Sequence, residues 1–200
     1  MIELENRYDD VKEAEIVHNE SDEAIYLRFL SERREADMIE LLHRYEEGLT
    51  LFLYGYVRNL QDAEELTYDT FAAISFHRGW RRNGASFKTW LFSVAQKQAL
   101  MFLRKHRIRQ EPLDESLAAP ELTDSRLLRE ERNRNLYTAM NLLNPEYREV
   151  LYLHYFEQLS HAEISRVMGR DLKQVYNLME RGRAALKTRL EGMGIHDADG

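Results

Sequence analysis

Apolar residues recur every three or four positions along most of this 200-residue chain, which is the spacing that gathers side chains on one face of a helix. The first such stripe runs from Met38 to Tyr56 and includes Gly48 and Gly55. It predicts one long core helix. The other periodic segments also have helical rather than strand spacing, and the chain contains only three prolines. We therefore predict an all-α protein.

Two further helix starts follow this long stripe. Asp62 and Glu65 have the spacing of a capping box, with Asp62 as the N-cap of a helix that continues through Ile74. Ser86 is a second candidate N-cap, and the apolar stripe after it extends from Phe87 to Phe102. These segments predict a first helical bundle.

The helical pattern is interrupted once, from Gln110 to about Thr123, where two of the three prolines lie. Such a segment is typical of a linker between domains. We therefore predict two small helical domains joined by a flexible linker. The predicted parts are an acidic N-terminal extension (1–23), a first domain (24–109), the linker (110–123), a second domain (124–191) and a flexible tail (192–200).

The second domain begins with a predicted helix from about residue 124 to 143. Asn144 and Pro145 then form an N-cap followed by proline at the first helical position, which predicts a helix through Tyr155. Ser160 and Glu163 form another capping box.

A tight turn follows that short helix. Gly169 suits a backbone with positive φ after the helix, and Asp171 with Gln174 caps the next one. Two short helices around such a turn predict a helix-turn-helix. Its second helix has a buried seam of apolar residues and presents long polar or basic side chains outward, which suit base edges in the DNA major groove and phosphates. These candidate DNA contacts are Arg170, Lys173, Gln174, Tyr176, Asn177, Arg181 and Arg183.

The distribution of charge supports a nucleic-acid partner although the net charge is −7. Residues 1–24 contain nine acidic and two basic residues, and therefore account for the entire net charge. Residues 77–109 contain nine basic residues and no acidic one. This basic segment and the basic second helix of the helix-turn-helix predict two DNA contacts on one chain. The acidic composition of the extension is typical of a solvated, partly disordered tail. An alternative hypothesis is that it folds back on the basic segment and masks it.

The composition excludes several other classes. Because the chain has no cysteine, it forms no disulfide and uses neither thiol catalysis nor cysteine-ligated metals. No run of 18 apolar residues and no positively charged leader before an apolar segment occurs, so we expect no membrane insertion and a cytoplasmic location.

Four segments resemble, in order and spacing, an extracytoplasmic-function (ECF) sigma factor, the two-domain sigma subunit of bacterial RNA polymerase. They are "DAEELTYDTF" (62–71), "SFKTWLFSVAQKQALMFLRKHR" (86–107), "LNPEYREVLYLHYFEQLSHAEIS" (143–165) and the helix-turn-helix. The resemblance covers roughly residues 24–190. It implies a transcription initiation factor rather than an enzyme, with no cofactor or metal. The implied partners are core polymerase, promoter DNA and an anti-sigma factor.

The resemblance also implies roles for individual residues. In the first domain, the positions that match the polymerase-binding motif are Asp62, Glu64, Glu65, Leu66 and Asp69. The positions implied to bind and melt the promoter's minus-ten element are Arg78, Trp80, Arg81, Arg82, Asn83, Lys88, Lys97 and Arg104. The second domain is implied to read the minus-thirty-five element. Trp90 lies on the apolar seam of its helix, so we expect it in the core.

The sequence departs from the family pattern at several of these sites. Tyr68 replaces a common glutamine in the polymerase-binding motif, and Lys97 and Met101 replace asparagine and aspartate in the melting helix. Tyr176 and Leu178 replace the usual lysine and arginine in the recognition helix. The promoter sequence therefore does not follow from the resemblance.

Two alternative functions are open at this point. A free-standing helix-turn-helix regulator would bind duplex DNA without polymerase and would not need the acidic helix. A metal-dependent enzyme would use His154, Glu157 and His161, but these residues span the predicted helix break at Ser160.

Overall fold

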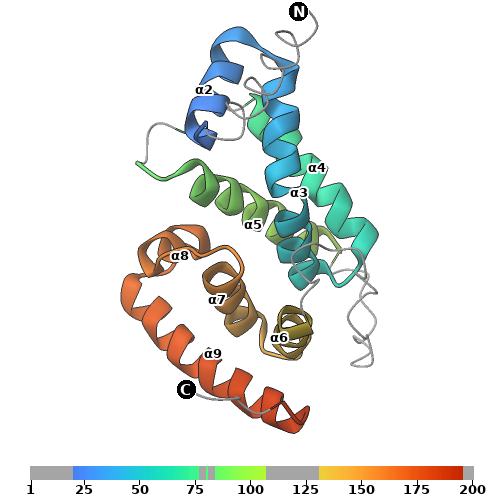
Figure 1. Ribbon diagram of the computed structural model, residues 1–200, viewed down its shortest axis with the longest axis vertical. Helices are drawn as coiled ribbons and strands as arrows, with labels where there is room; N and C mark the ends of the chain where they lie inside the picture. Colours follow the sequence, from blue (N-terminus) through green and yellow to red (C-terminus); the bar gives the residue numbers. More distant parts are fainter. Residues whose placement is uncertain (1–19, 77–79, 81–83, 107–130, 196–200) are drawn as a thin grey trace, which may run out of the picture.

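A computed structural model describes residues 20–76, 80, 84–106 and 131–195. All regular structure in these ranges is helical (Figure 1), which confirms the predicted fold class. The first half contains α2 (Asp22–Glu32), α3 (Glu35–Val57), α4 (Leu60–Phe76) and α5 (Phe87–His106). The second contains α6 (Glu131–Asn141), α7 (Pro145–Tyr155), α8 (His161–Met168) and α9 (Leu172–Gly192).

The long helix α3 forms the centre of the first half, as its apolar stripe predicts. Leu41, Leu49 and Leu53 are completely buried along it. Helices α2, α4 and α5 all pack against α3. This tertiary packing stabilises the helix, so that it continues through its two glycines.

Helix α2 was not predicted, and it begins two residues before the predicted start of the first domain. Ser21 caps it by accepting a hydrogen bond from the Ala24 N–H. The acidic residues at this point belong to the fold. Asp22 forms an ion pair with Arg44, and a Glu23 carboxylate oxygen accepts a hydrogen bond from the Phe87 N–H at the start of α5 (2.8 Å). The rest of the predicted acidic extension, residues 1–19, lies outside the described residues.

The predicted cap of α4 is wrong. The Asp62 N–H donates to the Asn59 side chain (3.0 Å), and the helix already begins at Leu60. Helix α3 ends at Val57, and Arg58 has a left-handed backbone with φ 59°. The connection is therefore so short that Asn59 occupies the capping position. Asp62 lies inside the first turn, where its charge still favours the helix dipole.

The caps of the second half are confirmed. The side chain of Asn144 accepts a hydrogen bond from the Glu146 N–H. Both predicted capping boxes, at Ser160 and at Asp171, are complete. Gly169 has φ 61°, so the turn uses the positive-φ conformation that favours glycine. Helices α8 and α9 thus form the predicted helix-turn-helix.

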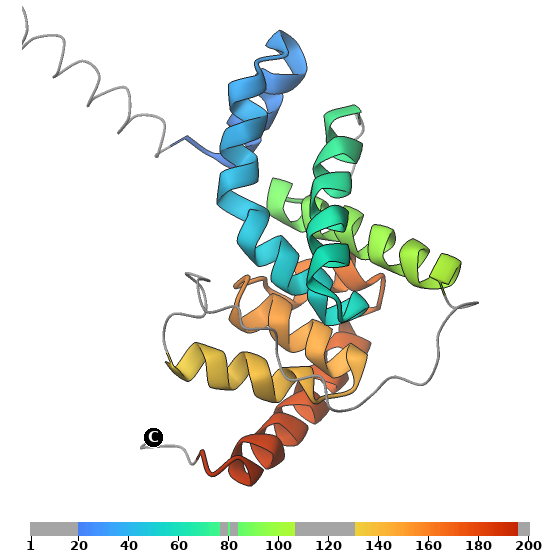
Figure 2. The same cartoon turned by 90° about the vertical axis from the view of Figure 1, so that its right-hand side faces the viewer.

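The two halves pack directly against each other, which the predicted linker did not indicate. Helix α5 lies on α8 and α3 lies on α7, as Figure 2 also shows. The rings of Phe52 and Tyr152 approach to 5.9 Å between centroids, and the Tyr152 hydroxyl donates to the Gly48 carbonyl (2.8 Å). A single hydrophobic core therefore continues from one half into the other.

Candidate nucleic-acid and protein interfaces

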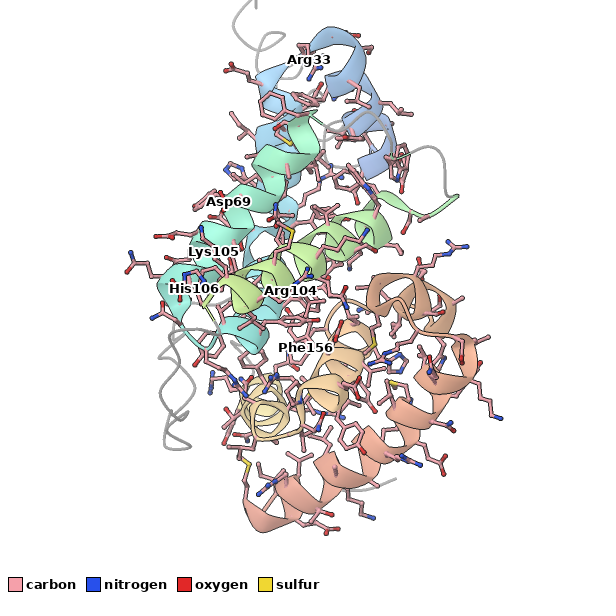
Figure 3. The ribbon with its side chains drawn as sticks, turned by 180° about the vertical axis from the view of Figure 1, so that it is seen from behind. Arg33, Asp69, Arg104, Lys105, His106 and Phe156 are labelled. Atoms are coloured by element: carbon pink, nitrogen blue, oxygen red, sulfur yellow. The ribbon has the colours of Figure 1, made fainter. Side chains whose placement is uncertain are left out.

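The acidic face of α4 is the first candidate interface. Glu64, Glu65 and Asp69 are exposed and Asp62 is half-buried. Asp69 lies on the outer side of the helix (Figure 3). Leu66 differs from this set because it is buried in the core, with 5% of the residue exposed. Three of the five predicted polymerase contacts therefore form an exposed acidic strip, and Leu66 supports the helix from behind.

Tyr68 is an exposed residue within this acidic strip. The residue is 52% exposed, and its hydroxyl donates to a carboxylate oxygen of Glu46 on α3 (2.6 Å). This hydrogen bond and the charge of Glu46 raise the pKa of the Tyr68 phenol. The departure from the family pattern thus places a rigid aromatic surface among carboxylates, an arrangement suited to a protein partner.

The outer face of α5 is the second candidate interface. Lys97 and Arg104 are exposed there, as predicted. Leu100 and Met101 between them are also exposed, by 41% and 57%. Arg104 and its basic neighbours Lys105 and His106 lie at the C-terminal end of the helix (Figure 3). Cations beside exposed apolar side chains suit single-stranded DNA, which offers phosphates and unstacked bases.

Lys88, at the start of the same helix, differs from Lys97 and Arg104. Its ammonium group forms an ion pair with the Glu157 carboxylate (2.9 Å) and donates to the Glu157 backbone carbonyl (2.7 Å). Glu157 belongs to the second half of the chain. A predicted DNA contact is therefore paired with a carboxylate of the same protein.

The loop before α5 is only partly described. Arg78, Arg81, Arg82 and Asn83 lie outside the described residues. Trp80 is described and is buried, with 8% exposed and its ring edge-on to Tyr26 at 5.9 Å. In this conformation its ring has no free face for a base. Trp90 also packs on Tyr26 (5.3 Å), but it is half-buried at the edge of the core rather than inside it as predicted.

The N-terminal turns of α9 are the third candidate interface. Val175, Met179 and Leu186 are buried along one side of the helix. The opposite side exposes all the predicted contacts of this helix, which are Lys173, Gln174, Tyr176, Asn177, Arg181 and Arg183. Gly182 allows the helix to lie close to Leu151, because an added Cβ would be 3.4 Å from that side chain. The buried seam thus fixes which face of α9 is exposed to solvent.

Two predicted contacts in this region already have partners. The Gln174 side-chain oxygen accepts from the Asp171 N–H (3.0 Å) as part of the cap. Arg170, in the turn before α9, forms an ion pair with Glu146. Arg170 must therefore leave this carboxylate before it can bind a phosphate.

A stack of three rings beside α9 was not predicted. His161 stacks on Tyr176 with 4.6 Å between centroids, and His154 also stacks on His161, at 5.5 Å. Arg183 donates toward the His154 Nε2 atom (3.3 Å). Burial and the nearby His154 and Arg183 lower the pKa of His161, so the neutral ring is favoured. The seven-residue spacing of the two histidines is the only sequence signal of this stack.

The same geometry does not support the metal-site alternative. Glu157 is buried and bound to Lys88, so it does not join His154 and His161 in one site. Within residues 20–76, 80, 84–106 and 131–195, no group of three or more acidic or histidine side chains is arranged to hold a metal. The same ranges contain no helix long and apolar enough to cross a bilayer.

Comparison with known proteins identifies both halves of the chain. Residues 41–108 match the family model "Sigma-70 region 2", and residues 133–186 match "Sigma-70, region 4". The chain is 31% identical over 136 residues to the RNA polymerase sigma factor CarQ of Myxococcus xanthus, a match that covers 65% of this chain and 75% of CarQ. It is 27% identical over 162 residues to the ECF RNA polymerase sigma factor SigM of Bacillus subtilis, covering 79% and 97%.

The fold is similar to that of a solved sigma factor. The structure of RpoE from Bartonella quintana, determined in complex with the anti-sigma factor NepR, superposes with a TM-score of 0.60 at 20% identity. The match covers 78% of this chain and 97% of RpoE. Two sigma-70 regions in the expected order, on helices that expose an acidic face and two basic faces, place this chain among the ECF sigma factors of RNA polymerase.

Proposed function

We propose that this sigma factor binds core RNA polymerase through the acidic face of α4 and reads promoter DNA with the outer faces of α5 and α9. The exposed carboxylates of Glu64, Glu65 and Asp69 are the proposed polymerase contacts. Charged rim residues of this kind chiefly set the rate and specificity of protein association.

The two DNA-binding faces have different tasks in this proposal. On α5, Lys97 and Arg104 follow the backbone of the opened strand, and the exposed Met101 packs against a base. The loop residues Arg78, Arg81, Arg82 and Asn83 belong to the same proposed minus-ten site. On α9, Asn177 and Tyr176 contact base edges of the minus-thirty-five element in the major groove, while Arg181 and Arg183 bind phosphates.

The observation that carries the proposal is the separation of faces on α9. Its apolar residues are buried on one side, and long polar and basic side chains fill the other. In the proposal the chain performs no bond chemistry, since RNA synthesis is catalysed by the polymerase, and it acts in the cytoplasm where the polymerase works.

A transcription assay tests this function. Purified bacterial core polymerase transcribes fragmented genomic DNA with and without the protein, and the new RNA 5′ ends are sequenced. We expect new starts that share a two-part upstream element. If the chain creates no new starts but still binds duplex DNA, it is a free-standing regulator and the proposal fails.

Two variants separate the proposed contacts. Replacing Glu64 and Glu65 by Gln should lower the RNA yield when core polymerase is limiting, and excess polymerase should restore it. Asn177→Ala should lower the yield by about tenfold at both polymerase concentrations, because a lost base contact costs roughly 1–3 kcal/mol. The control Glu191→Gln changes an exposed carboxylate at the end of α9 and should have no effect.

An anti-sigma partner is also part of the proposal. The support is that the similar RpoE was solved with an anti-sigma factor. Such a partner would compete with polymerase, so it should co-purify with the chain from its native cells and be displaced by core polymerase. Recovery of the chain alone at low salt would argue against it.

A further inference from the structure

We propose that the cavity between α3, α5, α6 and α7 binds a short-chain aliphatic carboxylate, and that Arg148 holds the carboxylate group. The residues that line this cavity are distinct from those proposed to contact polymerase and DNA. The inference therefore goes beyond the proposed function and does not depend on it. It rests on the charge, the hydrogen bonding and the apolar wall of the cavity.

The first observation is a buried cation without a counter-charge. Arg148 of α7 lines the cavity and is 8% exposed. Its guanidinium group has several N–H donors, but in the described part of the chain its side chain makes a single hydrogen bond, to the Asn141 carbonyl (3.3 Å). None of the ion pairs among these described residues includes Arg148. Because buried charges in proteins are normally paired, we expect an anion to complete this site.

A second cation lies beside Arg148. The guanidinium group of Arg58 donates to the Asn141 side-chain oxygen (2.9 Å) and to the Asn141 carbonyl, which is also the acceptor of Arg148. Burial and the charge of Arg58 lower the pKa of Arg148 to about 10, so Arg148 is still charged at neutral pH. Glu149 also lines the cavity, but its carboxylate accepts from Gln96 (3.0 Å) and affects Arg148 less than Arg58 does. An anion bound at Arg148 would offset the repulsion between the two arginines.

The third observation is a buried donor on the same cavity wall. The Tyr56 hydroxyl has no hydrogen-bond partner, although Glu149 and Gln96 lie close enough to affect its pKa. Burial raises the pKa of the Tyr56 phenol well above its ordinary value, and Glu149 raises it further. The hydroxyl is therefore protonated and able to donate. Because the charge of Arg148 acts on the same phenol, the two groups are neighbours, and in the proposal one carboxylate accepts from both.

The remaining wall of the cavity is mainly apolar. Leu51 and Phe52 of α3 and Leu103 of α5 line it. Tyr137 and Tyr152 also line it, but their hydroxyl groups already donate to backbone carbonyls of α3. An apolar wall with a few polar groups at one place is typical of a site for a small organic molecule. A bare inorganic anion would leave most of this wall without a contact.

The volume of the cavity limits the length of the ligand. It is about 90 Å³, whereas an apolar cavity of about 150 Å³ holds the roughly six carbon atoms of benzene. By this scale the cavity has room for about four non-hydrogen atoms, which is the size of acetate or propionate. The carboxylate of such a ligand would lie at Arg148, and its short alkyl group would be removed from water against the apolar wall.

An NMR titration of the full-length protein with sodium propionate tests the site. We expect saturable shifts of the Leu51 and Leu103 methyl signals, with a dissociation constant on the order of 1 mM for so small a ligand. Formate, which lacks the alkyl group, and propionamide, which has the same shape without the charge, should each bind at least about fivefold more weakly. Absence of saturation, or equal shifts with sodium chloride at the same ionic strength, would overturn the proposal.

Three variants separate the parts of the site. Arg148→Met removes the cation, so it should weaken propionate binding by about tenfold or more and leave propionamide binding unchanged. Tyr56→Phe removes the second donor and should weaken propionate binding by about threefold. Leu103→Trp fills the cavity and should abolish the binding of both ligands. Arg132→Met, which replaces an exposed arginine on α6, is the matched control and should bind propionate like the wild type.

The outcomes distinguish this site from the proposed function. Propionate binding that survives Arg148→Met or Leu103→Trp would show that the ligand lies elsewhere, and the inference would fail. Normal transcription by a protein that does not bind propionate would also overturn the inference but would leave the proposed function intact. Circular dichroism checks that each variant is folded. If Arg148→Met does not fold, the comparison of propionate with propionamide on the wild-type protein still decides whether the site selects a carboxylate.

Discussion

Tyr176 lies against His161, and His161 in turn lies against His154, so side chains outside the recognition helix orient a proposed base contact. We expect His161→Ala to weaken sequence discrimination at the minus-thirty-five element by about two- to tenfold, since a ring pair contributes roughly 0.5–1.5 kcal/mol. His161→Phe keeps the stack and should keep the discrimination. Sequencing of RNA 5′ ends from a library with a randomised minus-thirty-five element measures the change.

Tyr176→Phe provides the control for this prediction. If it leaves the preference unaltered, the Tyr176 hydroxyl does not read a base. If Tyr176→Ala alters the preference but His161→Ala does not, the stack does not position the tyrosine. A general loss of RNA from every promoter would indicate damage to the fold instead.

For single residues, the sequence predicted which side of its own helix a side chain lies on better than it predicted the side chain's contacts with the rest of the protein. Helical spacing placed Lys173 and Asn177 on the exposed face of α9 because that spacing depends only on the helix itself. The burial of Leu66 and Trp80, and the pairing of Lys88 with Glu157, depend on neighbours that are distant in the chain. No local pattern records such neighbours, so the predicted site included side chains that are buried or engaged.

Among the helices, α7 carries Glu149 at its contact with the first half of the chain. Glu149 accepts a hydrogen bond from Gln96 of α5 (3.0 Å) and also faces Tyr56 of α3. Burial raises the pKa of Glu149, and the nearby charge of Glu146 raises it further. Hydrogen bonds and the charge of Arg170 lower this pKa, but burial dominates and the net shift is upward. Because the pKa of Glu149 is raised in the folded protein, protonated Glu149 favours folding fully at a pH below the ordinary glutamate pKa. This contribution to the stability of the protein is lost as the pH rises through the raised value.

Glu149→Gln should therefore stabilise the protein at neutral pH. The variant keeps an acceptor for Gln96 and has no charge to bury, so its melting temperature should exceed that of the wild type by a few degrees. The difference should shrink as the pH falls toward 4, where Glu149 itself is protonated. Thermal unfolding followed by circular dichroism between pH 4 and pH 8 measures it, and a constant difference across this range would refute the assignment.

The helices themselves were predictable where their ends are local. Ser160 and Asp171 cap their helices through hydrogen bonds to residues three positions away, so the sequence contains the whole signal. Helix α2 was missed because its acidic residues resemble the solvated segment before it. Their contacts with residues distant in the chain, such as the ion pair of Asp22 with Arg44 and the hydrogen bond from the Phe87 N–H to Glu23, identify them as part of the fold.

For the molecule as a whole, the two halves share one continuous hydrophobic core, although each half matches a separate sigma-70 region. The predicted linker suggested independent domains, but buried contacts such as the hydrogen bond from the Tyr137 hydroxyl to the Leu51 carbonyl (2.9 Å) cross between them. Shared burial makes the stability of one half depend on the other. We therefore expect the free protein to unfold in one thermal transition rather than two.

Tyr152→Phe tests this coupling. The variant keeps the ring against Phe52 but removes the hydroxyl that donates to the Gly48 carbonyl (2.8 Å). A lost buried hydrogen bond costs about 1–3 kcal/mol, so the melting temperature should fall by several degrees and the transition should broaden or split as the halves separate. Tyr155→Phe, on the same helix but 42% exposed, is the matched control and should melt like the wild type. Two transitions in the wild type, unchanged by Tyr152→Phe, would mean that the two halves fold independently of each other.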